Sequence, residues 1–264
     1  MPKQFERIDL LLVDRGEAPT QEKAEKLIMA GNVIVNNQKV DKPGKQVPCN
    51  SIITLRQKLP YVSRGGLKLE KALSYFKIDV ADKLVIDVGA STGGFTDCLL
   101  KNGAKSVYAL DVGYGLIDLS LRNDERVHLF ENTNIRYVET DYFGVRFDMA
   151  TIDVSFISLD KVIPVVASLL GEDGQIIALI KPQFEAGRRY ISKGVVKDPD
   201  VHKSVIKNVC ELSQRIELVV KGITYSPIKG PAGNIEYFVW LQKGNGYILN
   251  IEEEIDKVVS EATS

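Results

Sequence analysis

Four charged residues, Lys68, Asp153, Lys181 and Glu236, lie where an α/β fold would place a reaction centre. Three of them border segments that we expect at the carboxyl edge of a sheet, and Lys68 lies on a helix just before that sheet begins. Ligands of doubly wound sheets bind at this edge. Two amines and two carboxylates gathered there could remove a proton from a weakly acidic group, although each residue alone would more simply be a surface ion pair.

The elements that would position these residues alternate between strand and helix. Apolar runs predict strands over 84–86, 106–110, 127–130, 149–152 and 175–180, with helices over 67–76, 95–100, 159–170 and 201–217. Two further strands, 218–225 and 237–241, have the pattern of a hairpin at one edge, and a short helix is expected over 251–259. This order is typical of a mostly parallel sheet with helices on both faces.

A glycine-rich turn after the first of these strands indicates a cofactor site. The spacing G-x-x-x-G-G differs from the G-x-G-x-x-G of dinucleotide sites, and an acid precedes it. A second acid ends the next strand, where a carboxylate can accept both hydroxyls of a ribose. This pattern favours a nucleoside cofactor, and the acid before the glycines suits a cationic one such as S-adenosylmethionine; the alternative is a turn that only packs. The candidate residues are Asp87, Gly89, Ala90, Ser91, Thr92, Gly93, Gly94 and Asp111.

The first 58 residues predict a separate small module. Two short helices are expected over 8–13 and 20–30, followed by strands over 33–35, 38–40 and 51–55. Residues 1–71 carry 13 Lys or Arg against 8 Asp or Glu, whereas the remainder carries 21 against 27. Such a basic front end suits a polyanionic partner, and a chance imbalance of exposed charges would explain it equally well.

This module resembles the S4 RNA-binding domain, which is a small α+β fold. The resemblance rests on Arg7-Ile8-Asp9, on 24–28 and on the run Gly31-Asn32-Val33-Ile34-Val35-Asn36; the chain departs at Gln21-Glu22, where the family usually has Ser-Arg. The residues then expected to meet RNA phosphates are Arg7, Lys23, Lys26, Lys39 and Lys42. We expect the S4-like domain over 1–58, a linker over 59–66 and a second domain over 67–264.

The whole chain resembles the TlyA (haemolysin A-like) family, in which an S4 domain is joined to an FtsJ-like methyltransferase. The matching runs are 63–69, 87–94, 111–113, 153–156, 181–185 and 230–236. The resemblance implies a Rossmann-like, S-adenosylmethionine-dependent methyltransferase that acts on the 2'-hydroxyl of a ribose in ribosomal RNA, with a cytidine as the target. The Lys-Asp-Lys-Glu tetrad of FtsJ-like enzymes maps onto Lys68, Asp153, Lys181 and Glu236.

The chemistry of these side chains is consistent with that implication. A lysine can act as a base near neutral pH only when burial or a neighbouring cation disfavours its charged form. We therefore expect Lys181 to accept the proton, with Lys68 close to it and the two carboxylates holding both amines; no metal is required. Three arginines beside the expected pocket, Arg64, Arg188 and Arg189, are further candidates for contacts with RNA, or else belong to an ordered loop without a ligand.

Composition excludes several other classes of protein. Three scattered cysteines and two histidines form no zinc or disulfide pattern, and no apolar run is long enough to span a bilayer. We expect a cytoplasmic protein, monomeric, that binds the ribosomal subunit and no membrane. The alternatives are a non-catalytic assembly factor that binds ribosomal RNA, a membrane-active haemolysin, which the missing apolar run disfavours, and a nicotinamide-dependent oxidoreductase, which the glycine spacing disfavours.

Overall fold

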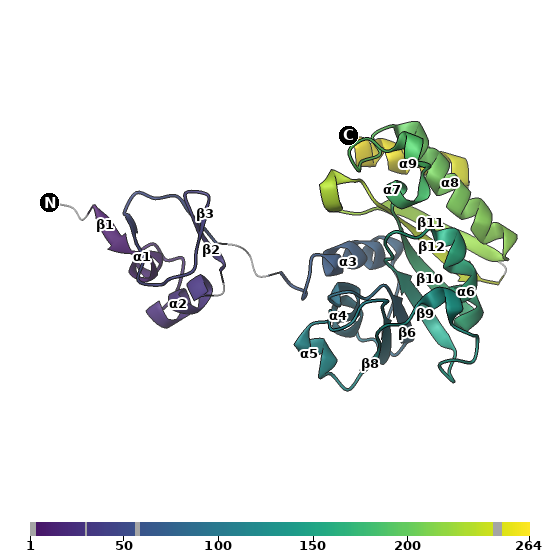
Figure 1. Cartoon of the computed structure of the whole chain (residues 1–264), viewed down its shortest axis with the longest axis horizontal. Helices are drawn as coiled ribbons and strands as arrows, with labels where there is room; N and C mark the ends of the chain where they lie inside the picture. The colour runs from purple at the N-terminus through teal and green to yellow at the C-terminus, as the bar shows by residue number, and fades with distance from the viewer. Residues whose placement is uncertain (1–3, 30, 56–58, 245–249) are drawn as a thin grey trace. The chain divides into compact units, whose positions relative to one another are not determined.

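The computed structural model describes residues 4–29, 31–55, 59–244 and 250–264, and the chain divides into two units, residues 1–59 and 60–264 (Figure 1). The expected boundary at residue 58 lies outside the described residues. In the described ranges, no helix is long and apolar enough to cross a membrane.

The described residues of the N-terminal unit form two helices and two small antiparallel sheets. Its helices are α1 (Ile8–Asp14) and α2 (Gln21–Met29), and its strands are β1 (Phe5–Arg7), β2 (Val33–Val35), β3 (Gln38–Val40), β4 (Gln46–Pro48) and β5 (Ile53–Leu55). β2 pairs with both β3 and β5, and β1 pairs with β4. The turn between β2 and β3 has positive φ at Asn36 and Asn37, as a tight hairpin turn requires. The sequence predicted both helices and the strands that are β2, β3 and β5, but neither β1 nor β4.

The second unit is built on a seven-stranded sheet with the order β11-β12-β10-β9-β6-β7-β8. Its strands are β6 (Leu84–Val88), β7 (Ser106–Leu110), β8 (Val127–Phe130), β9 (Phe147–Ile152), β10 (Leu170–Ile180), β11 (Leu218–Tyr225) and β12 (Tyr237–Lys243). The five strands that lie in the sheet order β8-β7-β6-β9-β10 are parallel to their neighbours, whereas β12 runs antiparallel to both β10 and β11. The expected hairpin at one edge of a parallel sheet is thus confirmed, and it brings the start of β12 to the carboxyl edge.

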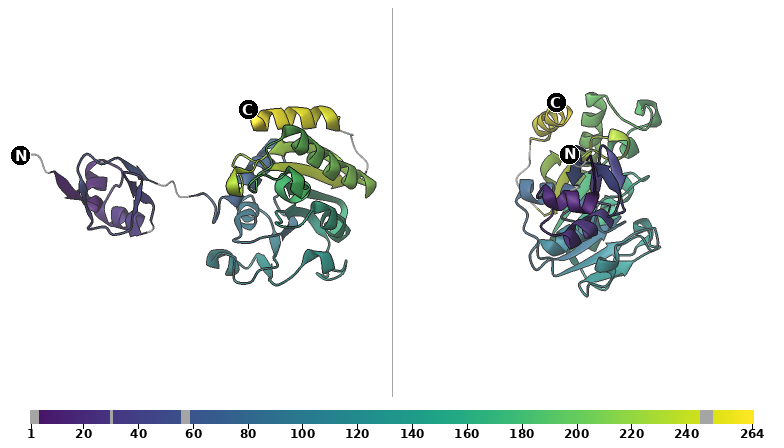
Figure 2. Two further views of the ribbon diagram at one scale, coloured as in Figure 1. Left: turned by 45° about the horizontal axis from the view of Figure 1, so that its top comes forward. Right: turned by 90° about the vertical axis from the view of Figure 1, so that its left-hand side faces the viewer.

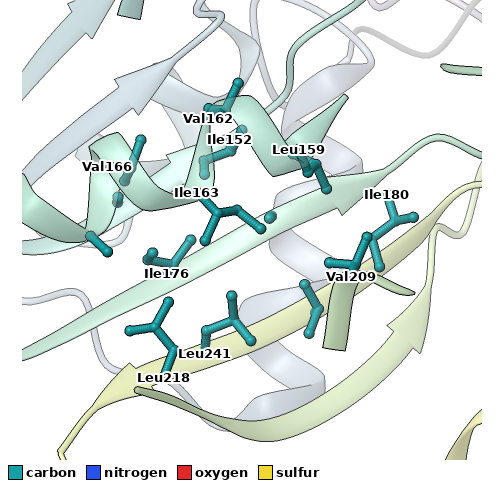
Figure 3. Close-up of a cluster of buried hydrophobic side chains, with 14 of the residues drawn as sticks. Ile152, Leu159, Val162, Ile163, Val166, Ile176, Ile180, Val209, Leu218 and Leu241 are labelled. Carbon is teal, nitrogen blue, oxygen red and sulfur yellow. The ribbon is translucent and has the colours of Figure 1, made fainter. Parts of the chain in front are cut away.

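Helices cover both faces of this sheet (Figure 2). The helices are α3 (Gly65–Phe76), α4 (Gly94–Lys101), α5 (Leu119–Arg122), α6 (Ile163–Leu169), α7 (Pro182–Glu185), α8 (Pro199–Arg215) and α9 (Ile251–Thr263). Because strand side chains alternate between faces, Val85, Val107 and Met149 pack toward α3 and α4, whereas Ile86 and Ile152 pack toward α6, α8 and α9. Figure 3 shows part of the hydrophobic cluster on the face covered by α6, α8 and α9, where α6 lies over β9 and β10.

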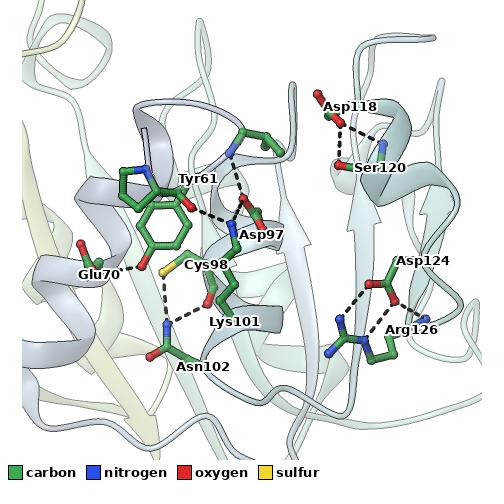
Figure 4. Close-up of polar contacts among 12 residues, drawn as sticks. Tyr61, Glu70, Asp97, Cys98, Lys101, Asn102, Asp118, Ser120, Asp124 and Arg126 are labelled. Carbon is green, nitrogen blue, oxygen red and sulfur yellow. Dashed lines mark hydrogen bonds and ion pairs between the residues drawn. The ribbon is translucent and has the colours of Figure 1, made fainter. Parts of the chain in front are cut away.

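Of residues 59–66, which we expected to be linker, those from Pro60 onward belong to the second unit, and Gly65 and Gly66 form the start of α3. Tyr61 is buried and its hydroxyl donates to Glu70 at 2.8 Å, while the Val62 amide donates to Asp97 at 2.8 Å (Figure 4). The ammonium of Lys101 bonds both Asp97 and the carbonyl of Pro60. The sequence suggested a linker because Pro60 interrupts secondary structure, but the aromatic ring of Tyr61 has apolar surface to bury.

Candidate active site

The four charged residues come together in one cavity of about 620 Å³ in the second unit. Lys68 lies on α3, Asp153 follows β9, and Lys181 follows β10. Glu236 directly precedes β12, whose antiparallel direction places its first residues at the carboxyl edge of the parallel strands. The expected gathering at this edge is therefore what the structure shows.

The Lys181 amine contacts two side chains, those of Asp153 and Ser155. Its side chain is 10% exposed, and its Nζ lies 2.6 Å from Asp153 Oδ1 and donates to Ser155 Oγ at 2.9 Å. Pro182 begins α7 directly afterwards, so Lys181 takes an extended backbone conformation that ends the strand at this point. The side chain is thereby fixed on two sides while its amine still borders the cavity.

Lys68 and Glu236 form a second, separate ion pair across the cavity wall. Lys68 Nζ donates to Glu236 Oε2 at 2.6 Å, and the Glu236 side chain is fully buried. Gly230 packs against this carboxylate so closely that a Cβ there would lie 2.2 Å from Glu236 Oε1. A buried carboxylate with one cationic partner has a fixed direction, which suits an orienting role.

Two buried acceptor atoms at this cavity have no hydrogen-bond donor among the described residues: Gln183 Oε1 and Glu236 Oε1. Asp153 Oδ1 also lacks a well-aligned hydrogen bond, but its 2.6 Å contact with the Lys181 ammonium compensates it electrostatically. Leaving a buried acceptor unpaired costs about 1–3 kcal/mol. A ligand that carries O–H or N–H groups would satisfy such atoms.

A second cavity of about 690 Å³ adjoins the first and shares with it Gly89, Ser91, Asp153, Ser155, Phe156 and Phe184. The turn after β6 forms the boundary between them. Gly89 has φ of +86°, and a Cβ there would lie 2.5 Å from the Asp153 carbonyl oxygen, so only glycine allows this approach. The glycine turn thus lies directly against the residue that carries a tetrad carboxylate.

Asp111 borders the second cavity at the end of β7. Its two carboxylate oxygens accept the amides of Ser91 at 2.8 Å and Gly113 at 2.7 Å. A carboxylate offers about four lone-pair positions, so each oxygen can still accept a further hydroxyl. Asn134 and Ile135 line the same cavity, which sequence reasoning did not foresee.

The other predicted cofactor residues take different positions. Ala90, Thr92 and Gly94 line the first cavity, whereas Gly93 and Asp87 line neither. Asp87 is completely buried and accepts the hydroxyls of Thr96 at 2.7 Å and Thr151 at 2.8 Å. Burial raises the pKa of Asp87 to about 6 against the opposing effect of these two hydrogen bonds. Asp87 therefore links the end of β6 to α4 and β9, the elements beside the glycine turn.

The residues predicted to bind RNA are all exposed. Arg64 lines the first cavity, and Arg188 and Arg189 follow α7 in a short 3-10 helix. In the N-terminal unit Arg7 forms a bidentate pair with buried Asp9, and Lys26 pairs with Glu22 on the same helix. Lys23, Lys39 and Lys42 are exposed as well. A role for any of these eight residues in binding RNA stays a prediction.

Sequence reasoning missed several side chains that border the first cavity. Ser155, Phe156, Gln183 and Lys229 are among them. Phe156 is 90% exposed at φ of +62°, an unfavourable conformation for an aromatic residue. The available signal was that Phe156 follows Asp153 closely in the chain, because residues directly after the end of a strand border the same pocket.

Glu185, the last residue of α7, connects the segments that follow β9 and β10. Its carboxylate accepts the Ser158 hydroxyl at 2.5 Å and the Leu159 amide at 2.9 Å, and desolvation raises its pKa. The bonds tie helix α7, which follows β10, to the start of the short 3-10 helix Leu159–Lys161, which follows β9. They therefore fix Lys181 and Asp153 relative to each other.

Comparison with known proteins shows the family. Residues 61–243 match the model of the FtsJ-like methyltransferases, and residues 6–53 match the S4 domain. The chain is 49% identical over 268 residues to the "Putative rRNA methyltransferase YqxC" of Bacillus subtilis, covering 99% of this chain and 95% of that protein. It is 40% identical over 261 residues to the "16S/23S rRNA (cytidine-2'-O)-methyltransferase TlyA" of Mycobacterium tuberculosis, covering 97% of each.

A solved structure agrees with these matches. The "Putative hemolysin from Streptococcus thermophilus" superposes with a TM-score of 0.77 at 44% identity, over 98% of this chain and 96% of that chain. With an FtsJ-like match over most of the second unit and an S4 match in the first, the chain belongs to the TlyA family of methyltransferases.

Proposed function

We propose that this protein transfers a methyl group from S-adenosylmethionine to a ribose 2'-hydroxyl of ribosomal RNA, with a cytidine as the target nucleotide. The observation that carries the proposal is the position of Lys181 beside Asp153, where the two cavities meet. One cavity has the donors and acceptors of a nucleoside site, and the other contains the amines and carboxylates that a proton transfer needs. The relatives named as rRNA methyltransferases support the choice of substrate.

The second cavity fits S-adenosylmethionine. Asp111 has free acceptor capacity on both oxygens for the two hydroxyls of a ribose, and Asn134 and Ile135 line the wall beside it. The glycine turn gives a ligand access to the backbone next to Asp153. When bound, S-adenosylmethionine supplies a methyl group on a positively charged sulfur, a ready electrophile.

Lys181 is the proposed proton acceptor. In its neutral form the amine would take the proton of the 2'-hydroxyl while the methyl group passes from the sulfur to that oxygen, which breaks the carbon–sulfur bond and leaves a neutral thioether. Asp153 would then compensate the charge of the resulting ammonium. Lys68 and Glu236 border the same cavity and would hold the ribose in line for attack. That Lys68 lies close enough to Lys181 to influence it remains a prediction.

The surroundings of the cavity suit a nucleotide that is taken out of a stacked RNA. Phe156 presents its ring to solvent at the border of both cavities and contacts Phe184 at 4.9 Å between ring centroids. An exposed aromatic ring at this point can stack on an unpaired base. Arg64 and Lys229 border the same cavity and can neutralise phosphates, while the S4 domain supplies a further RNA-binding surface.

The proposal is tested by transfer of labelled methyl from S-adenosylmethionine to ribosomal subunits from cells that lack the protein. A 2'-O-methylated linkage resists alkaline hydrolysis, so partial hydrolysis of the labelled RNA locates the nucleotide. The proposal predicts one protected linkage on the 3' side of a cytidine. Labelled RNA whose hydrolysis ladder shows no protected linkage would mean that a base is methylated instead, and would refute the ribose assignment.

A further inference from the structure

His202 is a buried histidine that the proposed reaction does not use. It lies on α8 with 1% exposure, and its Nδ1 is 2.7 Å from the Tyr237 hydroxyl oxygen. Its Nε2 is 2.9 Å from the carbonyl oxygen of Val196. Because a carbonyl oxygen can only accept, Nε2 donates to Val196, while Nδ1 forms the hydrogen bond with the Tyr237 hydroxyl. Both ring nitrogens are therefore fully committed.

The Tyr237 bond fixes the strand that presents Glu236. Successive side chains of a strand point to opposite faces. Tyr237 packs in the cluster on the side of α8, whereas Phe238 packs in the cluster that includes α3. Glu236 reaches α3 through Lys68. The start of β12 is thus held from one face by His202 and from the other by Lys68.

The Val196 bond fixes a second segment, which carries positive charge. Buried Asn234 accepts the Val196 amide at 3.3 Å and donates to the Gly194 carbonyl at 2.8 Å. The residues leading into this segment include the exposed Arg188, Arg189 and Lys193. One buried network therefore joins Gly194 and Val196, at the end of the basic segment 188–196, to Asn234 and Tyr237, which lie two residues before and one residue after Glu236.

We propose that His202 is a positioning residue, which holds the basic segment 188–196 and Glu236 in one fixed frame so that RNA bound at the first is aligned at the second. The inference rests on the proposed function, because the frame matters only if phosphates and ribose belong to one RNA. His202 itself borders neither cavity, so it acts through Tyr237 and Val196. Alignment of this kind governs the rate of the bound complex more than its affinity.

The test is Tyr237→Phe, which removes one hydroxyl and keeps the buried ring. The matched control is Ser213→Ala. Like that of Tyr237, the Ser213 side chain is buried and carries a hydroxyl; it lies on α8, as His202 does, and donates to the Val209 carbonyl at 2.8 Å. Ser213 is 11 residues from His202 along the helix, roughly 16 Å at 1.5 Å per residue. We expect Tyr237→Phe to lower kcat on ribosomal subunits about tenfold, with KM for the cofactor within about twofold. We expect Ser213→Ala to leave kcat within about twofold at a comparable loss of Tm.

Two results would overturn the inference while the proposed function stands: a Tyr237→Phe protein with the kcat of the unsubstituted chain, or a Ser213→Ala protein with the same kcat loss. His202→Ala provides a second reading, since added imidazole should restore part of the lost kcat if the ring acts by its two hydrogen bonds. A loss of kcat in His202→Ala that imidazole leaves unchanged, in protein with unaltered Tm, would count against the frame. Absence of methyl transfer by the unsubstituted chain would refute the proposed function and the inference together.

Discussion

Gly94, at the start of α4, is the position where one added methyl group should separate catalysis from folding. A Cβ at Gly94 would lie 2.3 Å from Ser63 Oγ, 2.9 Å from the Gly66 nitrogen and 3.1 Å from the Gly65 Cα. The hydroxyl of Ser63 can rotate away, but the two backbone atoms can move only with the start of α3. Gly94→Ala should therefore push α3, which carries Lys68, away from the glycine turn.

The size of the effect follows from two opposing contributions. Gly94 lies in a helix without a positive φ, so alanine gains up to about 1 kcal/mol in helix propensity. Overpacking against backbone costs about 1–3 kcal/mol, so the net loss in the free energy of unfolding lies between about 0 and 3 kcal/mol. Misplacement of a catalytic group by about 1 Å costs about 100-fold in rate. Since the required shift is a few tenths of an ångström to 1 Å, we expect kcat to fall about 10–100-fold.

The assay is single-turnover methyl transfer at saturating RNA, with Tm measured on the same protein. Gly171→Ala is the matched control, because Gly171 has no positive φ and its nearest outside atom would lie at an ordinary 3.8 Å from the added Cβ. The control should retain the full rate. A Gly94→Ala enzyme within about twofold of the unsubstituted rate would refute the reasoning, since α3 would then tolerate displacement.

Three further predictions concern the pocket and its supports. Burial raises the pKa of Asp87 from 3.8 to about 6, so as pH rises this carboxyl ionises in the unfolded chain before it ionises in the folded one. Its contribution to the free energy of unfolding should therefore fall by on the order of 3 kcal/mol between about pH 4 and 6. Urea unfolding at several pH values should show a weaker pH dependence of the free energy of unfolding for Asp87→Asn, and an equal pH dependence in both proteins would contradict the burial argument. Phe156→Ala should raise KM for RNA about 5–100-fold, because the exposed ring offers a stacking surface, without lowering Tm, because a ring exposed to 90% buries little area; an unchanged KM would exclude stacking. Glu185→Ala should lower both Tm and kcat, because it leaves the Ser158 hydroxyl and the Leu159 amide unpaired. Glu185→Gln keeps an acceptor and should recover most of both. Equal kcat in the two variants and the unsubstituted chain would show that these hydrogen bonds do not position Lys181.

The sheet and the gathering of the four charged residues could be predicted because local patterns and topology agree. Runs such as Ile176–Ile180 are continuous and apolar, as strands covered on both faces must be. The parallel order then sends residues that follow separate strands, such as Asp153 and Lys181, to the same edge. Only Glu236 needed an antiparallel strand, and the Pro/Gly loop before it indicated a reversal.

Features that depend on tertiary packing could not be predicted in the same way. The strands Phe5–Arg7 and Gln46–Pro48 lack the run of β-branched residues that marks Val33–Val35, so only their pairing with each other defines them. Asp87 has the sequence position of a ligand contact, yet it is completely buried and its two oxygens accept the hydroxyls of Thr96 on the next helix and of Thr151, 64 residues away on β9. Tyr61 and His202 likewise acquire their partners from other segments, 9 and 35 residues away in the chain.

The most direct test of the central claim is the rate of methyl transfer by Lys181→Met, compared with its affinity for S-adenosylmethionine measured by calorimetry. Lys181 borders only the first of the two cavities, so the substitution should leave cofactor affinity within about threefold. If Lys181 accepts the proton, the rate at saturating RNA should fall by at least about 100-fold, the lower range for a general base. A Lys181→Met enzyme that binds the cofactor normally and keeps more than about a tenth of the rate would contradict the assignment of Lys181 as the base.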